Sequence, residues 1–90
     1  MHEIWLIDDL IKKIESAARG CNSNKVVGVK VKLGALSHIS IDHFRMHFKD
    51  RSHGTIAQGA RLHIEVSGDI HDPRAQGVYL ESVQVEENDG

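Results

Sequence analysis

Hydrophobic residues return along the first part of the chain at the spacing of a helix. Between residues 4 and 19 the apolar positions recur at intervals of three and four, which forms one stripe along an amphipathic helix. The positions in this stripe are Ile7, Leu10, Ile11, Ile14, Ala17 and Ala18. Asp8 and Asp9 lie in the early turns and Arg19 lies in the last turn, where their charges suit the helix dipole. The pattern predicts a helix over residues 4–19.

Two later segments show the two-residue alternation of half-buried strands. In the strand predicted over residues 25–34, the inward residues are Val27, Val29, Val31 and Leu33. In the strand predicted over residues 60–67, the inward residues are Ala60, Leu62, Ile64 and Val66. The outward residues, which we expect to face solvent, are Gly28, Lys30, Lys32, Arg61, His63 and Glu65.

A third strand is predicted over residues 78–86, but its alternation changes phase along the way. The first apolar residues, Val78 and Leu80, fit one face of a strand, whereas the two later valines fit the other. One extra residue in a strand reverses the side to which the later side chains point. We therefore expect a β-bulge near Glu81 or Ser82.

A second, shorter helix is predicted over residues 41–51, between the first two strands. Ser40 stands where an N-cap residue is expected. Ile41, Phe44 and Phe48 share the face of this helix that we expect to be buried.

The order helix–strand–helix–strand–strand predicts an α/β fold of the two-layer α+β kind. The strand–helix–strand unit favours a parallel pair, and the third strand completes a mixed three-stranded sheet with both helices on one face. A loop over residues 67–77, which holds the only proline, joins the last two strands. No linker divides the chain, so we expect residues 1–90 to form a single domain.

Composition narrows the classes of function. A chain of 90 residues with 40% hydrophobic and 27% charged residues is typical of one small globular domain. A net charge of −2 gives no basic footprint for nucleic acid. No apolar run approaches the length of about 18 residues that a membrane span needs. The single cysteine, Cys21, excludes an internal disulfide and a cysteine-based zinc site, so a cytoplasmic setting is expected.

No motif in the sequence supports an enzyme. The segment from Gly54 to Gly59 has neither the lysine nor the spacing of a P-loop, and there is no nucleophile elbow. Asp8 and Asp9 are neighbours on a helix and point about 100° apart, which disfavours their sharing one substrate. We therefore expect no catalytic residues.

The first three residues, Met1, His2 and Glu3, form a candidate metal site. Methionine aminopeptidases need a small second residue, so a bulky His2 should leave Met1 in place with a free amine. This amine, deprotonated backbone amides and the His2 imidazole supply nitrogen donors in one plane, an arrangement that Ni(II) or Cu(II) prefers. From these residues alone, an ordinary chain start that binds no metal stays open as the alternative.

Six further histidines are spread along the chain. His43 and His47 are four residues apart on the second predicted helix, a spacing that lets two imidazoles share one metal. Because no third ligand accompanies them in the sequence, a solvated polar face is the simpler interpretation of this pair. The others, for which we expect surface positions, are His38, His53, His63 and His71.

The ordered set of segments resembles the HypA/HybF-type nickel-insertion proteins of hydrogenase maturation. The chain opens Met-His-Glu and runs directly into an amphipathic helix, and residues 25–37 (KVVGVKVKLGALS) are similar to the family's first strand and its ending. Residues 59–65 (GARLHIE) are similar to the family's Gly-Ala-x-Leu-x-Ile strand. Residues 80–83 (LESV) stand in the place of its Leu-x-Ser-Leu. The resemblance covers nearly the whole chain.

The resemblance implies a nickel metallochaperone whose metal site is Met1, His2 and Glu3. The implied ligands are the Met1 amine, the His2 imidazole and the backbone nitrogens of His2 and Glu3, with the Glu3 carboxylate beside them as a transfer group. The implied metal is Ni(II), held weakly enough to pass on by ligand exchange. The implied partners are a nickel-delivery GTPase, a hydrogenase large-subunit precursor, or both.

The main departure from the family concerns zinc. Family members carry a zinc domain with two Cys-x-x-Cys pairs between the second and third strands, where this chain has the loop 67–77 without cysteine. We therefore expect the nickel-binding domain alone, with no structural zinc. Two other functions stay open: a protein–protein interaction module that uses the open sheet face, and metal storage or sensing through the many histidines. An exposed sheet edge also makes a homodimer plausible.

Overall fold

The computed structural model describes residues 3–22, 25–37, 39–73, 75 and 77–86. Its elements, in chain order, are α1 (Glu3–Gly20), β1 (Val26–Leu33), α2 (Ile41–Ser52), β2 (Arg61–Val66) and β3 (Val78–Val85). Every predicted helix and strand is confirmed, and each end lies within one residue of its predicted place. The period of the hydrophobic residues was therefore sufficient to locate these elements.

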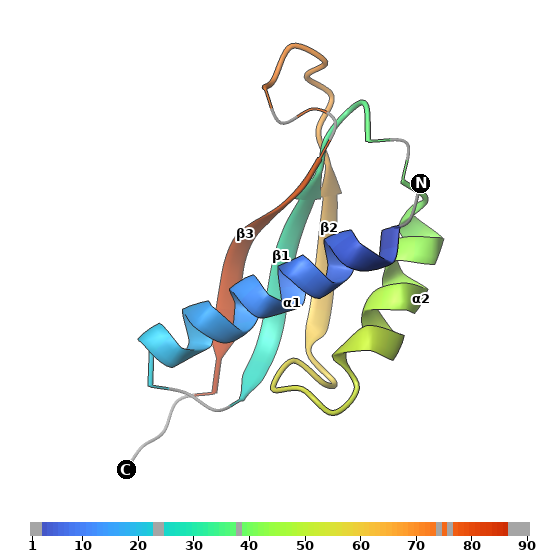
Figure 1. Cartoon of the computed structure of the whole chain (residues 1–90). Helices are drawn as coiled ribbons and strands as arrows, with labels where there is room; N and C mark the ends of the chain where they lie inside the picture. The colour runs from blue at the N-terminus through green and yellow to red at the C-terminus, as the bar shows by residue number, and fades with distance from the viewer. Residues whose placement is uncertain (1–2, 23–24, 38, 74, 76, 87–90) are drawn as a thin grey trace.

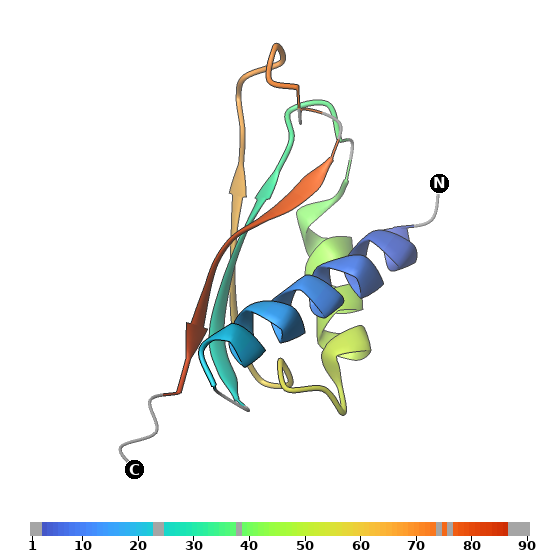
Figure 2. The same ribbon diagram turned by 60° about the vertical axis from the view of Figure 1, so that its left-hand side comes forward.

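The sheet has the predicted mixed topology. Its strand order is β2-β1-β3, in which β1 runs parallel to β2 and antiparallel to β3. Figure 1 shows α1 crossing in front of the strands with α2 beside β2, and Figure 2, turned by 60°, shows both helices on one side of the strands. The two-layer α+β fold is thus confirmed, with one sheet face covered by helices and the other face open.

The core lies between the helix layer and the sheet. Its buried residues are Ile7, Leu10, Ile11, Ile14, Ala18, Val26, Val29, Val31, Leu33, Phe44, Phe48 and Ala57. Of the stripe predicted on α1, only Ala17 is exposed. The rings of Phe44 and Phe48 stack with their centroids 6.5 Å apart, so α2 contributes the aromatic part of an otherwise aliphatic core. Neither helix, over the residues described, is long and apolar enough to cross a membrane.

The β-bulge expected in β3 is confirmed at Glu81. On β1, Lys30 pairs with Ser82. The next residue of β1, Val31, pairs with Leu80, so Glu81 is the extra residue of β3. This shift lets apolar residues on both sides of the bulge pack against the core, although they are out of phase in the sequence.

The predicted inward position of Val27 is wrong. A second register shift lies between Val26 and Gly28, which makes Val27 the extra residue on β1. Val26 is fully buried and Val27 is 42% exposed, the reverse of what an uninterrupted alternation gives. The irregularity near the start of β1 therefore changes which valine enters the core.

Two further residues predicted to be inward are exposed because they stand at the ends of their elements. Ile41 begins α2 and is 40% exposed, and Val66 ends β2 and is 52% exposed. Figure 1 shows the end of β2 extending beyond both helices, so the helix layer does not cover it. The hydrophobic spacing predicted the direction in which these two side chains point. It did not predict where the layer of structure that faces them ends.

The connection between β2 and β3 is hydrogen-bonded to the turn that follows β1. The Gly34 N–H donates to the Gly77 carbonyl (2.8 Å), and the Leu36 N–H donates to the Ala75 carbonyl (2.7 Å). Ala75 is itself buried. These contacts hold the loop 67–77 against the end of the sheet.

We expect Phe44→Ala to destabilise the protein strongly. The substitution leaves a cavity in the core beside Phe48, and such losses cost about 3–5 kcal/mol of unfolding free energy. Met46, on the same helix and 57% exposed, provides the control, and Met46→Ala should change the free energy by less than about 0.5 kcal/mol. Urea unfolding followed by circular dichroism measures both variants. Equal stability of the two would contradict the assignment of α2 to the core.

Candidate metal centre

The predicted metal site lies at the start of α1. Met1 and His2 fall outside the described residues, and Glu3 is the first residue of the helix. The chain start is therefore attached directly to the first turn of α1. The packing of α1 against the sheet and α2 therefore determines where the first residue of this helix lies in the molecule.

A charged pair fixes the first half of α1 against α2. The Arg51 guanidinium donates from Nε to Asp8 Oδ1 (2.8 Å) and from Nη2 to Asp8 Oδ2 (2.7 Å). These hydrogen bonds from Arg51 lower the pKa of the Asp8 carboxyl below its ordinary value. Two parallel hydrogen bonds between arginine and carboxylate define the orientation of both groups. The pair therefore joins the turn of α1 that carries Asp8 to the last turn of α2.

α2 is also held at its start and along its length. The Ser40 hydroxyl accepts a hydrogen bond from the His43 N–H (3.4 Å), which confirms the predicted N-cap. Arg45 Nη1 donates to the carbonyl of Leu62 on the edge strand β2 (2.8 Å). Together with the buried phenylalanines, these contacts give α2 a fixed position beside α1.

Two of the histidines lie together in the described structure. His43 and His47 stand one turn apart on α2, with ring centroids 6.4 Å apart and ring planes at 62° to each other. The remaining histidines occupy separate places or lie outside the described residues: His38, His53, His63 and His71. In the part of the chain that the structure describes, no three His, Cys, Asp or Glu side chains are grouped so as to hold a metal ion.

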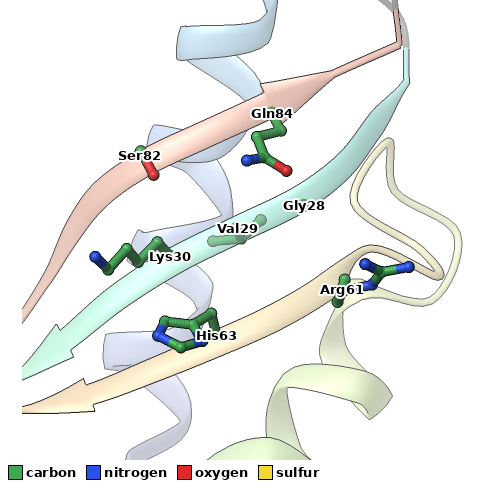
Figure 3. A pocket seen from close by; sticks show the side chains of 7 residues that line it. All are labelled: Gly28, Val29, Lys30, Arg61, His63, Ser82 and Gln84. Carbon is green, nitrogen blue, oxygen red and sulfur yellow. The ribbon is translucent and has the colours of Figure 1, made fainter.

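The open face of the sheet carries a polar hollow of about 320 Å³ (Figure 3). The residues that line it are Gly28, Val29, Lys30, Arg61, His63, Ser82 and Gln84. The Lys30 Nζ lies 3.4 Å from Glu65 Oε2 and 3.9 Å from Glu81 Oε2, so two carboxylates balance its positive charge. The Gln84 side chain lies over Gly28. A side chain at position 28 would collide with the amide oxygen of Gln84. The predicted polar outer face is confirmed except at Gly28, which was expected to face solvent but is buried beneath the Gln84 side chain. This face offers hydrogen-bonding groups, and the described residues on it form no cluster of metal ligands.

Sequence reasoning missed the Asp8–Arg51 pair. The helix dipole accounts for Asp8 within its own helix, but 43 residues separate it from Arg51 and no local pattern links the two. The same holds for Arg45 and the Leu62 carbonyl, which are 17 residues apart. Only the packing of the two helices on the sheet brings these groups together.

Comparison with known proteins identifies the family of this chain. A family model described as "Hydrogenase/urease nickel incorporation, metallochaperone, hypA" matches residues 1–70. The chain belongs to the HypA family. The HypA match begins at the candidate metal site and continues beyond the end of β2.

Curated HypA relatives are similar to about three quarters of this chain. The hydrogenase maturation factor HypA of Methylocella silvestris is 38% identical over 66 residues, which cover 73% of this chain and 58% of the relative. The corresponding protein of Rhodopseudomonas palustris (strain BisB5) is 42% identical over 69 residues, which cover 76% of this chain and 61% of the relative. The chain thus spans about three fifths of the length of these curated relatives.

Solved HypA structures share the fold. The solution structure of the Ni metallochaperone HypA from Helicobacter pylori gives a TM-score of 0.79 at 18% identity, covering 94% of this chain and 97% of that chain. A second HypA solution structure gives a TM-score of 0.71 at 19% identity, covering 96% of this chain and 97% of that one. At these identities the likeness establishes the common architecture.

We expect Asp8→Asn to weaken the protein at neutral pH but not in strong acid. A carboxyl whose pKa is lower in the folded than in the unfolded protein stabilises the fold fully above its unfolded pKa of about 3.9, and this contribution is lost as the pH falls through the folded pKa. The urea midpoint of Asp8→Asn should therefore fall below that of the wild type at neutral pH and approach it in acid, once the pH is below the lowered pKa of Asp8.

Asp9→Asn provides a matched control for this prediction. Asp9 pairs with Lys13 on its own helix (3.1 Å), and both side chains are more than half exposed, so its loss should move the midpoint less. A deficit of Asp8→Asn that is equally large at both pH values would contradict the role of the ionised carboxylate.

Proposed function

We propose that this chain binds Ni(II) at Met1, His2 and Glu3 and passes the metal to a recipient protein by ligand exchange. The observation that supports this most directly is the match of the nickel-incorporation family model, which includes the Met-His-Glu start. The curated relatives are hydrogenase maturation factors, and the H. pylori neighbour is a nickel metallochaperone. We carry these roles over as part of the proposal.

The proposed site is planar and rich in nitrogen. The Met1 amine, the His2 imidazole and the deprotonated backbone amides of His2 and Glu3 provide four nitrogen donors, which Ni(II) accepts in a square plane. A square plane leaves the metal open above and below, so an incoming ligand binds before a donor leaves. The Glu3 carboxylate then serves as a transfer group beside the plane. Exchange by this route gives release without unfolding the domain.

We propose that the chain acts as a nickel-binding domain without a structural zinc. Structural zinc sites need four nitrogen or sulfur ligands, usually with several cysteines. The loop 67–77, which is hydrogen-bonded to the turn after β1, contains no cysteine, and the only cysteine of the chain is Cys21. Nickel handling is therefore proposed to be independent of zinc in this protein.

The proposed recipients are a nickel-delivery GTPase, a hydrogenase large-subunit precursor, or both. Transfer by ligand exchange needs no catalytic residue in the donor protein, so the proposed role is that of a carrier rather than an enzyme. A homodimer is compatible with this role, because β2 and β3 are the edge strands of the sheet.

The open face of the sheet favours one alternative function, a protein–protein interaction module that binds no physiological metal. Its polar hollow combines the donors Arg61, Ser82 and Gln84 on a face that the helices leave free. Such a module would use the same fold but would not depend on His2.

Titration of Ni(II) into tag-free protein tests the proposal. We expect the first equivalent to produce the visible absorption of diamagnetic, square-planar Ni(II). His2→Ala should abolish this band because it removes the imidazole. One residue added before Met1 should abolish it as well, because the addition displaces the terminal amine from the chelate.

His71→Ala, a substitution of a histidine in the loop after β2, is the control and should keep the band unchanged. A band that survives in both N-terminal variants contradicts the proposed site. A wild-type protein that binds no Ni(II) also contradicts it and would favour the interaction module.

A further inference from the structure

We propose a second nickel site on α2, formed by the imidazoles of His43 and His47 and separate from the site at the chain start. The two rings are four residues apart on one helix, and their centroids lie 6.4 Å apart in an edge-to-face contact. Residues at this spacing are neighbours on the helix surface, which is how two imidazoles approach a single metal. The pair therefore needs only side-chain rotation to chelate an ion.

Both rings are available for this role. The His43 side chain is exposed, and the His47 side chain is half-buried. Among the described residues, neither imidazole has a hydrogen-bond or carboxylate partner, apart from the ring contact between them. The imidazole nitrogens thus do not have to leave another partner in order to bind a metal.

The helix that carries the pair is held in place from several sides. Phe44 and Phe48 are buried in the core, and Ser40 caps the first turn. Arg45 contacts the Leu62 carbonyl on β2. Because the backbone at both histidines is already fixed, the main entropy cost of binding a metal is the ordering of two side chains.

The pair lies on the flank of α2 that runs toward the start of α1. His43, His47 and Arg51 follow one another at intervals of four and form one stripe along the helix. Arg51 is the last residue of this stripe, and its guanidinium donates hydrogen bonds to Asp8 on α1. Figures 1 and 2 both show the first turn of α1 level with the first turns of α2, on the same side of the sheet.

This placement joins the two proposed sites functionally. Met1 and His2 precede the first residue of α1, and two residues extend by at most about 7 Å. Nickel at the chain start is therefore held at the same end of the helix layer as the first turns of α2. His43 and His47 would then give that nickel a second binding site on the same molecule.

The chemistry of the second site differs from that of the first. Imidazole nitrogen is a good ligand for nickel, but the described residues supply no third His, Cys, Asp or Glu beside the pair. Water then fills the remaining positions and gives a six-coordinate, paramagnetic Ni(II) that exchanges quickly. Such a site is suited to transit rather than storage. Its assignment to nickel rests on the proposed function.

Nitrogen-15 NMR during a Ni(II) titration distinguishes the two sites. We expect the first equivalent to leave the spectrum of α2 sharp, since planar Ni(II) is diamagnetic. The second equivalent should broaden the signals around His43 and His47. His43→Ala and His47→Gln should each abolish the broadening, because loss of one imidazole from a chelating pair weakens binding by roughly 100-fold.

Two controls make the outcome decisive. His53→Ala, at the end of the same helix, should leave both equivalents in place. His2→Ala should remove the first equivalent and retain the broadening at α2, so failure of the N-terminal site is seen separately from failure of this one. Circular dichroism verifies that each variant is folded. A second equivalent unchanged in His43→Ala, or no second equivalent in the wild type, would overturn the α2 site.

Discussion

The burial of the apolar stripe of α1 against β1 and β3 is the constraint on which the rest of the structure depends. It places the helix across one face of the sheet and leaves the opposite face to polar residues. It also fixes the backbone position of Glu3, which is the first residue of the same helix. The same packing brings Asp8 and Arg51 together, and their two hydrogen bonds link α1 to the side of α2 that carries Arg51.

Most of the fold could be predicted because each element carries its own periodic pattern. The phase change in β3 even predicted a bulge near Glu81 or Ser82, and the structure has it at Glu81. The pattern was insufficient at Val27, because the register shift in β1 arises from pairing with another strand. It was also insufficient at Ile41 and Val66, because the extent of the opposing layer is a property of the whole fold.

The candidate site shows a similar division. The Met-His-Glu start and the spacing of His43 and His47 are both visible in the sequence, and so is the resemblance to the HypA family. The sequence does not show that α2 turns this pair toward the beginning of α1. That relation follows from the packing of the two helices, which also brings Asp8 and Arg51 together although they are 43 positions apart. The three-dimensional structure agrees with the polar, solvated face expected for this pair, and the position of the pair on α2 is the basis on which we propose a second nickel site.

The central claim is that backbone nitrogens at the chain start bind the metal, and a count of released protons tests it most directly. Adding one equivalent of Ni(II) to unbuffered, tag-free protein at constant pH should release the amide protons of His2 and Glu3, together with any proton on the Met1 amine or the His2 imidazole. Release of both amide protons is the result that this account predicts. Release of no more than the amine and imidazole protons would show that the two backbone amides do not bind the metal and would contradict it.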